Sequence, residues 1–311
     1  MEHLSGRHNG VSLALLAVGL LAFGGLGGAG APAPAVEVSW TPAQPLQGSA
    51  VIVTVHPHAA SGADRIVAIQ GTLAGEALRF ERAGDGEFRA FGAVPVNARA
   101  QTLLPLVVVT AGGDTAYQVA RLPVGDGGFR MEQLRLPPRF VTPPDTLLPR
   151  LREQRRTIHE ALARTEETLR LWDTAFVRPL PGRVTDRFGT RRVLNGKTRG
   201  RHWGVDLSAR RGTPIHVTNR GVVVLSGRFY YQGNVVYVDH GGGLVTVYMH
   251  MSRRLVATGD TVEAGRVIGL TGATGRVTGP HLHWTAYFGD VLFNPLSLLT
   301  LDVRSLVAAP E

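Results

Sequence analysis

The stretch Gly279-Pro280-His281-Leu282-His283-Trp284 places two histidines two positions apart, directly after a glycine and a proline. On a β-strand, side chains two positions apart project from the same face, and their α-carbons lie about 6.6 Å apart. His281 and His283 can therefore reach one small site. Because imidazole serves both as a metal ligand and as a proton acceptor, this stretch favours a strand that carries a metal or catalytic site.

Two further segments supply side chains of the same kind, His202-Trp203-Gly204-Val205-Asp206 and Tyr248-Met249-His250. Zinc in catalytic sites usually takes three protein ligands from His and Asp or Glu and leaves a fourth position open. A fully extended strand would hold His202 and Asp206 about 13 Å apart, too far for one ion. The chain must bend between them, and Gly204 permits the bend.

The sequence around these segments predicts a β domain. Glycine is dense after Phe176, and short valine-rich runs are punctuated by glycines, as is typical of antiparallel sheet. The expected strands are Gly221–Leu225, Val235–Val238, Leu244–Tyr248 and Val267–Leu270. We therefore expect a C-terminal Gly-rich antiparallel β domain over residues 177–300, followed by a C-terminal tail over 301–311.

The three histidine segments and their neighbours resemble the lysostaphin-like zinc metallopeptidases, peptidase family M twenty-three, whose pattern is H-x-x-x-D, Y-x-H and H-x-H. The resemblance covers roughly Pro179 to Leu298. Beyond the histidine segments it includes Asp186-Arg187-Phe188-Gly189-Thr190-Arg191, Gly204-Val205-Asp206-Leu207-Ser208-Ala209, Asp239-His240-Gly241 and Thr271-Gly272-Ala273-Thr274-Gly275-Arg276-Val277-Thr278-Gly279-Pro280.

This resemblance implies that His202, Asp206 and His283 bind one Zn²⁺ per chain and that His250 and His281 are catalytic. The choice of His283 over His281 as the ligand comes entirely from the resemblance, since spacing does not separate them. We assign His281 as the base that takes a proton from water, with His250 stabilising the tetrahedral intermediate. The two roles could also be exchanged or shared.

The N-terminal half predicts a second β domain, an immunoglobulin-like β-sandwich over residues 36–124, because β-branched and aromatic runs alternate with turn clusters. Its expected strands are Val51–Val55, Arg65–Ile69, Leu78–Arg82, Glu87–Phe91, Leu104–Thr110 and Ala116–Leu122. Residues 125–176 are expected to form a linker that is rich in glycine and proline at first and then carries an amphipathic helix from Thr146 to Trp172. We interpret His56-Pro57-His58 as surface residues.

Residues 1–35 read as a signal peptide, with Arg7, an apolar run from Val11 to Phe23, and small residues ending at Ala35, where we expect cleavage. The alternative is an uncleaved anchor, although the compact run is shorter than the ~20 residues of a spanning helix. We therefore expect an exported protein, periplasmic or extracellular at the cell wall, without stable membrane insertion after cleavage. Cysteine is absent, so neither disulfides nor Cys ligands are available.

These features together predict a zinc endopeptidase that cuts peptide cross-links or bridges of bacterial peptidoglycan. The substrate is an implication of the resemblance, and the sequence does not say which bond is cut or what the N-terminal domain does. The alternative is a non-catalytic wall-binding or activator protein on the same fold. The net charge of +9 favours anionic partners, but no recognition motif supports nucleic acid. The oligomeric state is left open.

Overall fold

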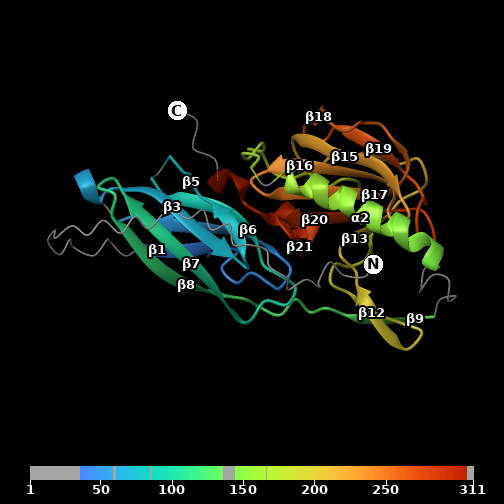
Figure 1. Ribbon diagram of the computed structural model, residues 1–311, viewed down its shortest axis with the longest axis horizontal. Coiled ribbons are helices and arrows are strands. Elements are labelled where there is room, and N and C mark those ends of the chain that lie inside the picture. Colours follow the sequence, from blue (N-terminus) through green and yellow to red (C-terminus); the bar gives the residue numbers. More distant parts are fainter. Residues whose placement is uncertain (1–35, 59–60, 85, 136–143, 166, 307–311) are drawn as a thin grey trace.

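A computed structural model describes residues 36–306 of the chain, apart from 59–60, 85, 136–143 and 166 (Figure 1). The predicted signal peptide, and the tail beyond residue 306, lie outside the described residues. The chain is mainly β, which confirms the predicted fold class. Within the described ranges, no helix is both long and apolar enough to cross a membrane.

The N-terminal domain consists of two antiparallel sheets that share one core. One has the order β1 (Glu37–Thr41), β2 (Ala50–His56), β6 (Phe88–Ala93) and β5 (Glu81–Arg82). The other has the order β4 (Glu76–Arg79), β3 (Ile66–Leu73), β7 (Gln101–Thr110) and β8 (Thr115–Pro123). Inward-facing residues alternate with outward-facing ones along β7, as expected where one face of a sheet is buried. The immunoglobulin-like topology stays a prediction.

The linker contains a strand that the sequence analysis did not predict. β9 (Met131–Leu134) pairs in parallel with β11 (Arg191–Leu194), which forms a hairpin with β12 (Lys197–Arg201). The glycines and prolines around β9 give no local signal for a strand. Its partner lies about sixty residues further along the chain, so the pairing is not visible in the local sequence either. The linker thereby becomes part of the C-terminal domain's surface.

The linker helix is shorter than predicted. A 3₁₀ turn, Asp145–Leu147, leads into α2 (Leu148–Ala163), and the helix does not continue to Trp172. Residues after the helix instead bond to the turn between β16 and β17, where the N–H of Gly242 donates to the carbonyl of Thr168 at 2.8 Å. These bonds hold the segment extended, and Trp172 is fully buried in the main core.

The C-terminal domain is built on one ten-stranded sheet. Its central order is β10 (Val184–Asp186), β13 (Val205–Ser208), β20 (His281–Phe288), β17 (Leu244–Arg254), β16 (Gly233–Gly241), β15 (Gly221–Phe229) and β18 (Thr261–Val262). The other members are β14 (Pro214–His216), β19 (Val267–Thr271) and β21 (Val291–Phe293). All pairs in it are antiparallel, and the four predicted strands lie within β15, β16, β17 and β19.

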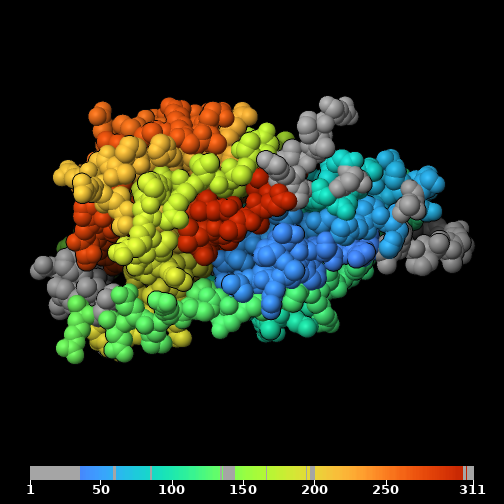
Figure 2. Space-filling model, turned by 180° about the vertical axis from the view of Figure 1, so that it is seen from behind, coloured from blue at the N-terminus to red at the C-terminus, as the bar shows by residue number. Residues whose placement is uncertain are grey.

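Short 3₁₀ helices complete the described chain: η1 (Gly62–Asp64), η3 (Pro295–Thr300) and η4 (Val303–Leu306). The predicted C-terminal tail packs against the rest of the protein as far as it is described, because Leu301, Val303 and Leu306 are buried in the main core. Figure 2 shows this end of the chain, in red, lying directly against the blue N-terminal domain.

The two β domains are joined by a shared apolar core. Phe91 of β6 makes ring contacts with Trp172, Phe288 and Phe293, at centroid distances of 5.9, 5.5 and 6.0 Å. The N-terminal domain thus packs on β20 and β21, two strands that belong to the sheet of the predicted active site.

Candidate active site

All five predicted site residues line a single cleft of about 1050 Å³ in the C-terminal domain. The linker contributes one wall, through Arg130, Met131 and Glu132. A second cavity, of about 820 Å³, lies between the two β domains and contains none of the five. His56 is remote from the cleft and is bonded to Ser39 and Glu87.

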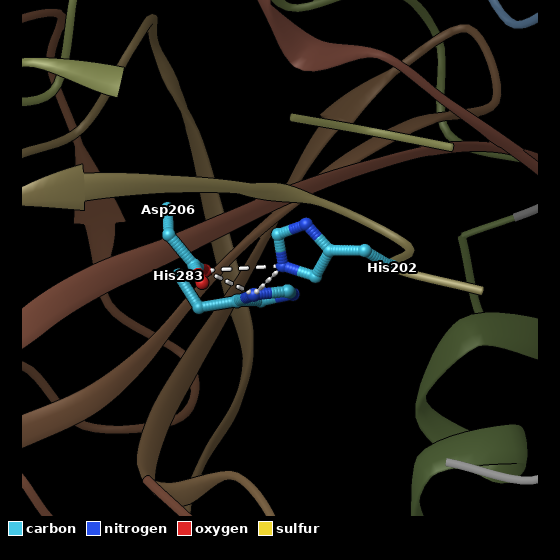
Figure 3. A group of neighbouring side chains, drawn as sticks. All are labelled: His202, Asp206 and His283. Carbon is cyan, nitrogen blue, oxygen red and sulfur yellow. Dashed lines mark hydrogen bonds and ion pairs between the residues drawn. The ribbon is translucent and has the colours of Figure 1, made fainter. Parts of the chain in front are cut away.

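Strand pairing brings the three predicted ligands together (Figure 3). Asp206 of β13 is the direct partner of His283 on the neighbouring β20, so their side chains lie side by side. His202 precedes β13, and the chain bends at Gly204 before the strand begins. The distances are 2.8 Å from His283 Nδ1 to Asp206 Oδ1, 3.1 Å from His202 Nε2 to Asp206 Oδ1, and 3.0 Å between the two ring nitrogens.

Gly204 is required by close packing as well as by the bend. A β-carbon at this position would lie 2.6 Å from His283 Nε2 and 2.5 Å from Thr285 Oγ1. The backbone at Gly204 does not lie in the left-handed region, so the bend alone does not demand glycine. The expected bend is present, and the close approach is an additional reason for the residue.

The donor set fits a metal ion. Each of the three residues offers one ligand atom, and these atoms lie within 4.8 Å of one another. Tetrahedral ligands about 2.0–2.1 Å from zinc would be ~3.3 Å apart, close to the separations seen. It is the only such group of His, Cys, Asp or Glu among the residues that the structure describes.

The ring nitrogens of His202 and His283 that point away from the cluster make hydrogen bonds, and these orient the other ring nitrogen of each histidine toward the cluster. His202 Nδ1 lies 3.0 Å from the carbonyl oxygen of Arg187, to which it donates, and this leaves the lone pair of Nε2 facing the cluster. His283 Nε2 lies 2.9 Å from the hydroxyl of Thr285, which leaves the lone pair of Nδ1 facing the cluster. Hydrogen bonds to the ring nitrogen that does not face the metal fix the tautomer and orientation of metal-binding histidines.

The electrostatics of the cluster favour an ionised carboxylate at Asp206 and a neutral ring at His283. Burial alone would raise the pKa of Asp206, but the adjoining rings of His202 and His283 outweigh it, and the net pKa lies well below the ordinary value. Burial lowers the pKa of His283. In the tautomers that the outer hydrogen bonds set, the cluster therefore presents a carboxylate and two ring lone pairs to a cation.

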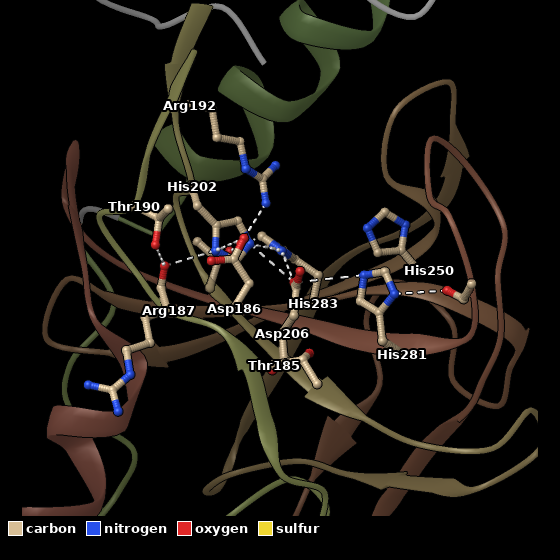
Figure 4. A network of polar contacts seen from close by, with 12 residues as sticks. Thr185, Asp186, Arg187, Thr190, Arg192, His202, Asp206, His250, His281 and His283 are labelled. Carbon is tan, nitrogen blue, oxygen red and sulfur yellow. Dashed lines mark hydrogen bonds and ion pairs between the residues drawn. The ribbon is translucent and has the colours of Figure 1, made fainter. Parts of the chain in front are cut away.

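His250 and His281 lie beside this cluster, with their ring centroids 5.0 Å apart (Figure 4). His250 Nδ1 donates to the carbonyl of Thr274 and His281 Nδ1 donates to the carbonyl of Gly279, each at 2.9 Å. In both rings the neutral form therefore carries its lone pair on Nε2. His281 Nε2 is 3.7 Å from Asp206 Oδ1, so this lone pair lies at the edge of the ligand cluster.

The pKa of His250 is lowered to about 3, mainly by burial, with smaller contributions from His283 and His281 in the same direction. The ring is therefore neutral across the ordinary working range of pH. It can accept a hydrogen bond at Nε2, but it can donate one there only after it has taken up a proton.

A backbone irregularity aims His250 at the cluster. β16 pairs with β17 through Asn234 with Met251 and through Val236 with Tyr248, which leaves one extra residue on β17. His250 occupies this bulge with φ of 63°, in the left-handed region. Its N–H donates to the carbonyl of Gln232 at 2.9 Å. Bulges near active sites commonly re-aim a side chain in this way, at a cost of about 1–2 kcal/mol for a residue that is not glycine.

The structure adds residues to which the sequence analysis gave no role. Asp186 lies between His202 Nδ1, at 3.3 Å, and the guanidinium of Arg192, with which it forms an ion pair. Thr285, Thr274 and Gly279 orient three of the histidines, as described above. Asp186, Thr274 and Gly279 lie in segments that carry the resemblance, but whether a backbone carbonyl faces a ring cannot be read from residue type.

Comparison with known proteins agrees with this geometry. Residues 200–295 match the model of Peptidase family M23. The peptidoglycan DD-endopeptidase ShyC of Vibrio cholerae is 40% identical over 126 residues, which are 40% of this chain and 29% of ShyC. The DD-carboxypeptidase/endopeptidase Mpg of Neisseria meningitidis is 40% identical over 116 residues, 37% of this chain and 27% of Mpg. The matches thus span less than a third of either relative.

The similarity in structure extends beyond the matched domain. A crystallised Pseudomonas aeruginosa protein, described as an M23 peptidase, superposes with a TM-score of 0.61 over 82% of this chain and 95% of its own. At 24% identity, it shows that the fold is shared over that part of the chain. The sequence match, the relatives and the ligand cluster lead to the same assignment: residues 200–295 of this chain form a domain of peptidase family M23.

Proposed function

We propose that this chain is a zinc-dependent endopeptidase that hydrolyses peptide bonds in bacterial peptidoglycan. One observation carries the proposal: a His-Asp-His ligand cluster and two further imidazoles, each with its Nε2 lone pair available, line one cleft. A site for zinc alone would not need the second pair of histidines.

His202, Asp206 and His283 would hold the zinc ion. When bound, zinc polarises a carbonyl and acidifies water near neutral pH. The three residues supply two neutral nitrogens and one carboxylate, so the ion keeps a net positive charge that can act on the substrate.

His281 and His250 would move the proton. His281 Nε2 accepts the proton of the attacking water and delivers it to the departing amine. His250, whose low pKa keeps it neutral before reaction, acts on the oxygen of the tetrahedral carbon only after taking up a proton from solvent. Stabilisation of that oxygen requires a donor at His250 Nε2. The position of His281 Nε2 at the edge of the ligand cluster, 3.7 Å from Asp206 Oδ1, supports His281 as the base and leaves His250 to respond to negative charge.

The substrate class is supported by the relatives, of which ShyC is named a peptidoglycan DD-endopeptidase. It also agrees with the expected export of the protein after removal of residues 1–35. We propose the domain boundaries 36–124, 125–176 and 177–300 for the mature chain, with the N-terminal domain in an accessory role.

The test is to incubate purified residues 36–311 with intact peptidoglycan, with and without a zinc chelator, and to identify the products by mass spectrometry. Metal content is measured on the same sample. We expect one zinc per chain and the chelator-sensitive appearance of new amine and carboxylate ends at one type of bond. A full zinc site without cleavage would contradict the substrate, whereas absence of both would favour the activator alternative.

A further inference from the structure

The cavity between the two β domains, here called the interdomain cavity, has the size and the location of a ligand-binding site. Its volume of about 820 Å³ lies within the usual range for such sites, which commonly form at domain interfaces. Three parts of the chain build its wall: the N-terminal domain within 41–50, the linker within 127–130, and the C-terminal domain within 184–190 and 294–301. A ligand in this cavity would therefore contact both domains and the linker.

The interdomain cavity adjoins the catalytic cleft. Four residues line both of them: Arg130, Val184, Arg187 and Thr190. One residue can border two cavities only where the cavities are neighbours, so the interdomain cavity lies within the span of a single residue of the cleft. A substrate that is too long for the cleft therefore finds a second binding surface directly beside it.

The segment between the interdomain cavity and the cleft also holds a zinc ligand. His202 Nδ1 donates to the carbonyl of Arg187 at 3.0 Å, and the N–H of His202 donates to the carbonyl of Thr190 at 2.8 Å. Figure 4 shows that the side chain of Arg187 points away from the ligand cluster. The backbone of Arg187 thus supports the metal site, while its side chain lines the interdomain cavity.

The interdomain cavity offers positive charge without negative charge. None of the described residues that line it is acidic, whereas Arg130 and Arg187 both line it and both are exposed. Gln44 of the N-terminal domain lines it as well. Within the described part of the chain, none of these three side chains forms a hydrogen bond or an ion pair. Unpaired cations in a concave site attract an anionic group, and an amide can add a hydrogen bond to it.

We propose that the interdomain cavity binds a segment of the substrate that carries free carboxylates and lies away from the scissile bond, with Arg187, Arg130 and Gln44 as its contacts. In peptidoglycan this segment is a stem peptide. A guanidinium suits a carboxylate, because it can donate two parallel N–H groups to it. The inference rests on the proposed function for the identity of the substrate, and it gives the N-terminal domain a part in binding that substrate.

The test measures the binding of a ligand without a cross-link, so that cleavage of cross-links plays no part. The ligand is the monomeric disaccharide-tripeptide of peptidoglycan, used as such and after conversion of its free carboxylates to carboxamides. Calorimetry on the zinc-loaded protein should show roughly tenfold tighter binding of the acid form than of the amide form, the size expected for one charged hydrogen-bonded pair.

Gln44→Ala is the variant that identifies the site, because Gln44 lines the interdomain cavity and not the catalytic cleft. It should weaken binding of the acid form about fivefold, the effect of one neutral hydrogen bond. Arg187→Gln should weaken it roughly tenfold and reduce the preference for the acid form. Arg187→Lys should recover part of that preference, because a lysine keeps the charge but lacks the fork. All affinities are compared at full zinc occupancy, measured by metal analysis.

Arg211→Gln is the matched control, since Arg211 is exposed, lines neither the interdomain cavity nor the cleft, and loses the same charge. It should bind both forms like the wild type. Equal affinity of the wild type for the two forms would overturn the proposal, as would binding that Gln44→Ala and Arg187→Gln leave unchanged.

Two results separate this inference from the proposed function. Binding of the acid form that depends on Gln44 and Arg187, without cleavage of cross-linked peptidoglycan by the wild type, would uphold the interdomain site and reject the peptidase. Cleavage of cross-linked peptidoglycan by a protein that does not bind the monomeric ligand would uphold the peptidase and reject the interdomain site.

Discussion

His281 and His283 lie two residues apart on β20, yet their rings face the cluster differently. His283 puts Nδ1 2.8 Å from Asp206 Oδ1, whereas the nearest ring nitrogen of His281 is 3.7 Å from the same oxygen. The geometry thus separates a ligand position from a position beside the ligands, a distinction that spacing in the sequence leaves open.

Substitution of these two histidines should have different consequences. His281→Ala should retain zinc and lose activity by a factor of about 10²–10⁴, the usual contribution of a general base. His283→Ala should weaken zinc binding and activity together, since one of three ligands is lost. Metal analysis by mass spectrometry and hydrolysis rates distinguish the outcomes, and retention of zinc by His283→Ala would contradict the assignment.

Thr285 is predicted to support the metal through His283. The hydroxyl lies 2.9 Å from His283 Nε2, and the side chain is fully buried. Thr285→Val should weaken zinc affinity by roughly 10- to 100-fold, the typical effect of losing a hydrogen bond that orients a metal-binding histidine. Thr285→Ser keeps the hydroxyl and should bind zinc like the wild type. Competition with a chelator of known affinity measures both.

At the level of elements, β16 and β17 are joined by a buried polar group away from the cleft. His240 of β16 lies 2.7 Å from both the carbonyl of Arg220 and the hydroxyl of Thr246. Burial lowers the pKa of His240 to about 4. The folded protein therefore holds this ring neutral, while the unfolded chain protonates it at about pH 6.5.

The folded pKa is depressed, so the unfolded state binds more protons as the pH falls. The stabilisation is fully present above about pH 6.5 and is lost progressively down to about pH 4, amounting to about 3 kcal/mol. Urea unfolding of the zinc-free protein at pH 7.5 and pH 4.5 measures it. His240→Gln should reduce the difference between the two pH values, and His159→Gln, at an exposed position on α2, should leave it unchanged.

In the whole molecule, both apolar and polar contacts hold the N-terminal domain against the C-terminal sheet. Beyond the aromatic cluster around Phe91, Glu81 forms an ion pair with Arg170, and the N–H of Ala50 donates to Ser297 Oγ at 2.9 Å. The N-terminal domain is thus fixed against the strands that carry the active site.

Phe91→Ala should lower the free energy of unfolding by about 3–5 kcal/mol, because it opens a cavity in the core that the domains share. The wild type should unfold in one transition in guanidinium chloride. Tyr117→Ala, which removes an aromatic ring that is 71% exposed, should have little effect. Two transitions, of which Phe91→Ala shifts only the one that belongs to the N-terminal domain, would show that the domains are not coupled.

The residue types of the site and four strands of the C-terminal sheet could be predicted from local sequence. His202, Asp206, His250, His281 and His283 were all named from the three histidine segments and from the resemblance. This was possible because metal chemistry restricts which side chains can serve, and because alternating valine-rich runs between glycines are a strong local signal for strands.

Features that depend on contacts between distant segments could not be predicted from local sequence. Asp206 meets His283 because β13 and β20 are neighbours in the sheet, and His250 points at the cluster because a bulge opens where β17 meets β16. The same holds for the linker: β9 is a strand because it finds β11, and Trp172 leaves the expected helix because the shared core receives it. Local sequence specifies propensity, whereas pairing and burial are settled by long-range packing, whose free energy exceeds the propensity of any short segment.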